Sequence, residues 1–178
     1  MLGRRVGRAQ GAGSLIDVIA RWLGLGGNPA GVIFGTITVG AVLAGENAKG
    51  ETVATSVEVA LLVVALFWLV HAWSDDTGER IRQRRRLQWR PLLATLEHQA
   101  SILRAVLVPV VVLGIAGLAG ANDATALWVG TVTCAVSLVL IELISALRNR
   151  LPFAQVLVET AAGAAFGCAL LVLHFLVV

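Results

Sequence analysis

Residues 53–73 read VATSVEVALLVVALFWLVHAW, the most hydrophobic stretch of the chain. A run of about 20 apolar residues is what an α-helix needs to cross the hydrocarbon core of a bilayer. Apolar stretches of similar character lie before and after it, so the sequence predicts five membrane spans. They are residues 29–45, 53–73, 101–120, 124–147 and 152–178.

The composition excludes a soluble globular domain. Hydrophobic residues make up 57% of the 178 residues, charged residues make up 14%, and the mean hydropathy is +0.84. Soluble domains carry about 25% charged residues, and a chain of this size could not bury so much apolar surface beneath a polar exterior. We therefore predict an all-α polytopic membrane protein, in which residues 28–178 form a single domain with five transmembrane helices.

Proline and capping residues predict where these helices begin and bend. Asn28 caps the first span and Pro29 occupies its first helical position. Asn122 or Asp123 can cap the fourth span. Pro109 should kink the third span, because proline removes a backbone donor and clashes with the preceding turn.

Two segments outside the spans are expected to be helical. Residues 1–27 form a cytoplasmic N-terminus whose residues 14–23 are amphipathic, with Ser14, Asp17 and Arg21 opposite an apolar face. That helix lies in the membrane interface or packs as a soluble helix on the bundle, two alternatives that the pattern favours equally. Residues 74–100 form a basic cytoplasmic segment, much of which should be helical. Pro91 should begin a new helix that runs on into the third span, and we expect this part to lie along the membrane surface with its apolar leucines.

The basic residues predict the orientation. All of the 14 Lys and Arg residues except Lys49 fall before the first span, between the second and third spans, or between the fourth and fifth. Cytoplasmic loops carry an excess of Lys and Arg. We therefore expect a multi-pass protein of the cell (inner) membrane, with the N-terminus in the cytoplasm and the C-terminus outside.

Acids and histidines inside the spans are the strongest indication of function, because an ionisable group at membrane depth needs a partner, a water-filled cavity or a task. The orientation sorts them into two layers: an inner layer with His71, Asp75, Glu142 and Glu159, and an outer layer with Glu46, Glu58 and His174. Glu142 could be neutralised by Arg104 or Arg148. The carboxyl group of Glu58 should be protonated or bonded to threonine or serine hydroxyls of neighbouring helices. The candidates for a transport path are Glu58, His71, Glu142, Glu159 and His174.

In the fifth span, Glu159, Gly163, Gly167, Leu170 and His174 lie along one stripe at spacings of four and three residues. One interpretation is that the stripe faces a permeation path, with the acid and the histidine as stations for a cation or proton. The other is that the two glycines form a helix-packing face and the polar residues hydrogen-bond across it. The spacing supports both equally.

The polar end of the second span allows a further pair of interpretations. His71, Asp75 and Glu79 recur every four residues, so they could share a divalent metal ion. We favour the alternative, in which these acids pair with the following arginines, for example Asp76 with Arg80. The arginines of this segment are expected to bind anionic lipid headgroups rather than nucleic acid. They are Arg82, Arg84, Arg85 and Arg86.

The layout of the spans resembles the vacuolar iron transporter family. The similarity is carried by residues 141–153 (IELISALRNRLPF), 158–178 (VETAAGAAFGCALLVLHFLVV) and 32–45 (VIFGTITVGAVLAG), with a charged segment between spans two and three. The resemblance implies exchange of divalent iron or manganese against protons by a dimer. The family's metal-binding motifs are absent here: the first span has no acid, and Met1 is the only methionine. The composition also resembles that of small membrane proteins of high-GC bacteria.

We predict a homo-oligomer, with a dimer favoured, that moves a cation or protons. The alternative is a membrane scaffold or lipid-binding subunit that transports nothing and whose working surface is the basic cytoplasmic segment. No nucleophile, phosphate-loop or zinc pattern is present in the sequence, so we do not expect an enzyme; intramembrane hydrolysis is the most distant option. The sequence indicates no particular cofactor.

Overall fold

The computed structural model describes residues 28–177, which are helical and contain no strand. The all-α prediction is therefore confirmed for this part of the chain; the expected helix at residues 14–23 lies outside it. The helices are α2 (Pro29–Lys49), α3 (Val53–Gln83), α4 (Trp89–His98), α5 (Ser101–Arg104), α6 (Leu107–Leu118), α7 (Asp123–Arg148) and α8 (Phe153–Val177).

Five helical stretches of the described residues are long and apolar enough to cross a membrane, which confirms the polytopic fold. Four of them are the single helices α2, α3, α7 and α8, and the third span is built from α4, α5 and α6 together. The expected boundaries differ most around residues 74–100. Residues 74–83 continue α3, and α4 folds back along it, where the Trp68 indole donates a 3.0 Å hydrogen bond to the carbonyl of Leu96.

The third span is interrupted after Arg104, as Pro109 predicts. Proline has no N–H to donate to the carbonyl of Ala105, and its ring crowds that same carbonyl. The turn tightens there: the amides of Ala105 and Val106 bond carbonyls three residues earlier, at 3.3 and 3.4 Å. The span therefore changes direction between α5 and α6.

Side-chain caps begin three of the spans, α2, α3 and α7, and the Thr52 hydroxyl is the cap of α3. The Asn28 carboxamide oxygen accepts a 3.0 Å bond from the amide of Gly31, as predicted. Asn122, rather than Asp123, caps α7 by accepting a 2.8 Å bond from the amide of Thr125. The carboxylate of Asp123 instead accepts a 3.1 Å bond from the amide of Val53 and so joins the starts of α7 and α3.

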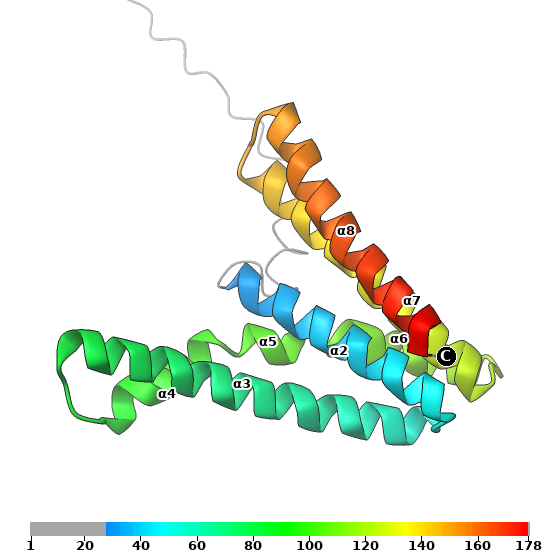
Figure 1. Cartoon of the computed structure of the whole chain (residues 1–178), viewed down its shortest axis with the longest axis horizontal. Coiled ribbons are helices and arrows are strands. Elements are labelled where there is room, and N and C mark those ends of the chain that lie inside the picture. Colours follow the sequence, from blue (N-terminus) through cyan, green and yellow to red (C-terminus); the bar gives the residue numbers. More distant parts are fainter. Residues whose placement is uncertain (1–27, 178) are drawn as a thin grey trace, which may run out of the picture.

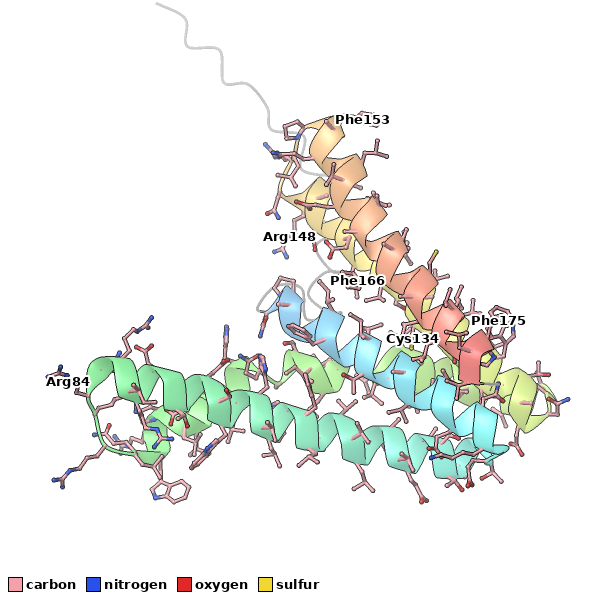
Figure 2. All side chains as sticks on the ribbon, in the orientation of Figure 1. Arg84, Cys134, Arg148, Phe153, Phe166 and Phe175 are labelled. Carbon is pink, nitrogen blue, oxygen red and sulfur yellow. The ribbon has the colours of Figure 1, made fainter. Side chains whose placement is uncertain are left out.

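The helices form two arms that converge at one end (Figure 1). One arm is α3 with α4, the other is α7 with α8, and α2 lies between them and packs against both. Figure 2 shows Arg84 and Arg148 near the diverging ends of the arms and Phe175 where they converge. We call these the arginine end and the lysine end, because Lys49 ends α2 at the latter.

The core lies where α2, α6 and α7 meet, and its fully buried side chains include Leu43, Leu113 and Leu127. Close backbone contact between α2 and α5 depends on glycine. A Cβ atom at Gly35 would lie 2.5 Å from the carbonyl oxygen of Ile102, so no other residue fits without moving α5. By contrast, α3 and α8 expose large apolar side chains along most of their length, as helices that face lipid do.

Candidate functional site

Two of the predicted acids meet between α7 and α8, toward the arginine end. Glu142 and Glu159 are half-buried, and the Glu142 side chain lies against α8 one turn from Glu159. The approach is possible because Gly163 lies one turn from Glu159. A Cβ atom at Gly163 would lie 2.8 Å from the carbonyl oxygen of Leu138 and 3.0 Å from the Glu142 side chain. The structure thus brings together two carboxyl groups that the sequence placed in one layer.

His174 lies near the lysine end of the same pair of helices and is only 5% exposed. Its Nε2 atom is 3.4 Å from the Asn47 carboxamide nitrogen, a long contact for a hydrogen bond. The Trp128 ring lies against the imidazole, with 4.6 Å between ring centroids. The Nδ1 atom of His174 is buried and has no hydrogen-bond partner in the described chain. This histidine is therefore desolvated with only part of its bonding capacity used.

The stripe that joins these two places is closed by packing. Gly163, Gly167, Leu170 and His174 are the buried residues of α8. A Cβ atom at Gly167 would lie 2.9 Å from the carbonyl oxygen of Ala135 on α7. The glycines therefore form a helix-packing face within one chain, which is what the second interpretation of the stripe expects.

His71 belongs to a chain of polar groups at the arginine end. Its ring stacks on Phe67, at 5.9 Å between centroids and 15° between planes, and its Nε2 atom lies 4.0 Å from the Asp75 carboxylate. That carboxylate accepts a hydrogen bond from the buried Gln99 side chain, whose oxygen accepts one from the side chain of Asn28. The chain links α3 to the start of α2.

The predicted metal ligands are not brought together. Within residues 28–177 no group of three or more His, Cys, Asp or Glu side chains is arranged to hold a metal ion. The Glu79 carboxylate instead accepts hydrogen bonds from Arg82 and Gln83. His71 and Asp75 approach one another only at the distance given above, so the favoured pairing of the acids with arginines describes this segment better.

Asp76 is the centre of a buried ion-pair cluster. Its side chain is fully buried, with one oxygen 2.8 Å from Arg80 Nε and the other 2.7 Å from Arg85 Nη2. The predicted pair with Arg80 is confirmed, although those two atoms are not aligned as a hydrogen bond. Arg85 reaches back because Arg84 ends α3 in the left-handed conformation, with φ 51°. Of the four arginines expected to bind lipid headgroups, Arg82, Arg84 and Arg86 are exposed. Arg82 and Arg85 also pair with acids of α3.

Glu58 lies on the exposed surface of α3. The hydroxyls that could have neutralised it serve their own helices: those of Thr36, Thr38, Thr131 and Thr133 each donate to the carbonyl four residues earlier. Glu58 begins the second turn of α3, about 8 Å from the start of the helix. Its side chain therefore faces outward from the single chain, within a stretch that can span the membrane.

Several polar partners were not foreseen from the sequence. Asn47 was placed beyond the end of the first span, Gln99 was placed on the surface, and Trp128 was counted only as part of the fourth span. Each touches a residue remote in the chain, 127 positions away for Asn47 and 71 for the bond between Gln99 and Asn28. A capping pattern or a hydrophobic period carries no information on such pairs.

No family model matches this chain, and neither a curated protein nor a solved structure matches it. The resemblance to the vacuolar iron transporter family therefore rests on the layout of the spans. That layout establishes a polytopic membrane protein without assigning a family.

Proposed function

We propose that this membrane protein carries protons or a small cation, and that the pair formed by Glu142 and Glu159 is its central site. The observation that carries the proposal is that the Glu142 side chain of α7 lies against Gly163 of α8, one helical turn from Glu159, in neighbouring membrane-spanning helices. Two carboxylates that share a site of low dielectric constant are costly when both are ionised. Binding one proton or one cation between them removes that cost, so the pair favours occupancy by a positive charge.

The orientation proposed for transport places the arginine end in the cytoplasm of a cell whose inner membrane holds the protein. The carboxyl pair then lies toward the cytoplasmic side and His174 toward the outside. Glu159 and His174 are separated by about 22 Å along α8 at the normal helical rise. The contact between α7 and α8, which we call the seam, is closed by glycine packing between these two residues. Charge transfer therefore requires α7 and α8 to separate, or a path along a subunit interface.

A homo-oligomer, with a dimer favoured, fits the position of Glu58. An ionisable side chain that faces lipid costs a few kcal/mol, and Glu58 is exposed on α3 of the single chain. Contact with a second copy along α3 would remove this residue from lipid and place it in the assembly. Glu58 then becomes available to a path between subunits.

The test is proton flux into proteoliposomes that contain a pH-sensitive dye, with a potassium diffusion potential as driving force. Glu142→Gln and Glu159→Gln should each abolish flux, because an amide neither binds nor releases a proton at the pH of the assay. Glu97→Gln, at an exposed position of α4, is the matched control and should keep wild-type flux. Wild-type-like flux in both seam variants would overturn the proposal.

A second candidate function is a scaffold or lipid-binding subunit that acts through its basic end. The observation that favours it is the turn between α3 and α4, where Arg84 and Arg86 are exposed and the nearby Trp89 is 72% exposed. Under this function the wild-type chain shows no flux, and replacing the two arginines with glutamine weakens association with anionic vesicles or a cytoplasmic partner while Glu159→Gln has no effect.

A further inference from the structure

A cavity of about 280 Å³ lies on the side of α5 and α6 that faces α7, toward the arginine end. Most of its lining is apolar and includes Val32, Val108, Leu140 and Ile141, with a hydroxyl from Ser137. Arg104 is the one charged residue that lines it in the described chain. An apolar cavity with a single cation at its edge fits a ligand that has a hydrocarbon tail and an anionic head.

The fold explains why the cavity exists. α2 is held against α5 by the contact at Gly35, whereas the arm of α7 and α8 leans away from α5 toward the arginine end (Figure 1). A second hollow of about 180 Å³ shares Ile144 with the first and continues to Pro29, Arg148 and Asn149, at the ends of α2 and α7. Together the two make a groove that runs from the middle of the span toward its basic end.

Arg104 is placed to bind the head of such a ligand. It ends α5, its side chain is exposed, and it forms no ion pair with any other residue of the described chain. The planar guanidinium group donates two parallel hydrogen bonds to a phosphate. Arginines near a helix end reach along apolar surface to the headgroup layer. The expected role of Arg104 as a counter-ion of Glu142 is thus not observed.

We propose that this groove is a binding site for an anionic phospholipid, with one acyl chain in the cavity and the phosphate held by Arg104. Net charge selects the lipid: an anionic headgroup complements the basic end of the groove, whereas a zwitterionic headgroup would add its own cation there. In the orientation above the lipid comes from the cytoplasmic leaflet, whose surface is negative. The site does not depend on whether the carboxyl pair carries protons.

The test is native mass spectrometry of the full chain in detergent, titrated with phosphatidylglycerol or with phosphatidylcholine of the same acyl chains. Wild-type protein should bind phosphatidylglycerol about fivefold more tightly, as expected for one cation near the headgroup. Arg104→Gln should weaken phosphatidylglycerol binding about tenfold, the loss of one charge-assisted contact. Arg104→Lys, which keeps the charge without the paired donors, should fall between the two.

Two further variants separate this site from general attraction to a basic surface. Arg150→Gln removes an exposed charge at the same end of the molecule, outside the groove, and should leave the preference unchanged. Val108→Phe fills the cavity and should reduce binding of both lipids. The proposal is overturned if Arg104→Gln titrates like the wild type, if Arg150→Gln loses as much, or if Val108→Phe binds normally. Helical circular dichroism verifies that each variant is folded.

Discussion

Acids occupy two regions of this molecule under opposite electrostatic conditions. Near the C-terminal end of α3, Asp76 is fully buried but lies between two guanidinium groups. In the seam between α7 and α8, the Glu142 side chain lies against Gly163, one helical turn from the carboxyl group of Glu159. The first arrangement stabilises the folded chain only while the acid keeps its charge. The second arrangement is stabilised by binding a positive charge, as a ligand site is, whereas a purely structural contact needs no ligand.

The largest expected effect comes from breaking the first region. Asp76→Ala leaves two arginines partly buried without their anion, and removing one partner of a buried ion pair costs about 3 kcal/mol or more. The loss should appear as a clear drop in the midpoint of thermal unfolding in detergent. Glu79→Gln, which removes a neighbouring acid in a more exposed ion pair, should change the midpoint little. Equal effects of the two substitutions would mean that burial of Asp76 is not what matters.

The next effect tests how tightly the second region is closed. Gly163→Ala places a methyl group 2.8 Å from the carbonyl oxygen of Leu138, so α7 and α8 must shift, at a cost of about 2 kcal/mol. Gly117→Ala is the matched control, because a Cβ atom there meets nothing within 4 Å. Unfolding in a series of detergent mixtures measures both. If the two variants unfold together, the seam is looser than the contact indicates.

A smaller effect, of opposite sign to that at Asp76, is expected from the carboxyl pair itself. Glu142→Gln or Glu159→Gln removes one carboxyl group of the pair, together with its need for a bound positive charge, and should stabilise the fold slightly. The double variant should gain less than the sum of the single changes, with a coupling energy of about 0.5 kcal/mol or more. A thermal-unfolding cycle at neutral pH provides the four values. Strict additivity would show that the two side chains do not sense one another.

The smallest effect lies at the lysine end, where an ion pair joins the exposed Lys49 to the buried Glu46 at 2.7 Å. The hydrogen bond from Lys49 to the Glu46 carboxylate raises the pKa of Lys49 above its ordinary value. A raised lysine pKa contributes stability that is fully present below the unfolded value, about 10.4, and is lost as the pH rises through the folded value. Lys49→Gln should therefore lower stability slightly at neutral pH and should abolish the decline in stability at high pH, which thermal unfolding at the two pH values measures.

The spans could be predicted from the sequence because each depends on local information. The apolar run at 53–73 is long enough to cross a bilayer, Asn28 caps the first helix, and Pro109 disrupts the third. Helix was expected in residues 74–83, but its unbroken continuation from the second span was not, because these residues are polar and have no apolar period that joins them to the span. Their helix is supported by ion pairs to arginine, one of which closes only through the left-handed conformation of Arg84.

The candidate site was predicted only in part, for a related reason. Depth along each span sorted Glu142 and Glu159 into one layer, because depth follows from the number of residues along a helix. Which side of each helix faces its neighbour depends on packing between distant segments. Asn47, which meets His174, could not be identified in this way, and neither could the exposed position of Glu58.

The contact at Gly35 also bears on how relatives of this chain could be identified. Leucine, valine and isoleucine exchange freely on a helix that faces lipid, so most of the sequence can change without changing the fold. Gly35 has no such freedom, because the carbonyl oxygen of Ile102 leaves no room for a Cβ atom. Over long divergence, the spacing of Gly35, Gly163 and Gly167 should outlast the apolar sequence around them. A search keyed to those three positions would recognise descendants of the same ancestor that overall similarity has ceased to reveal.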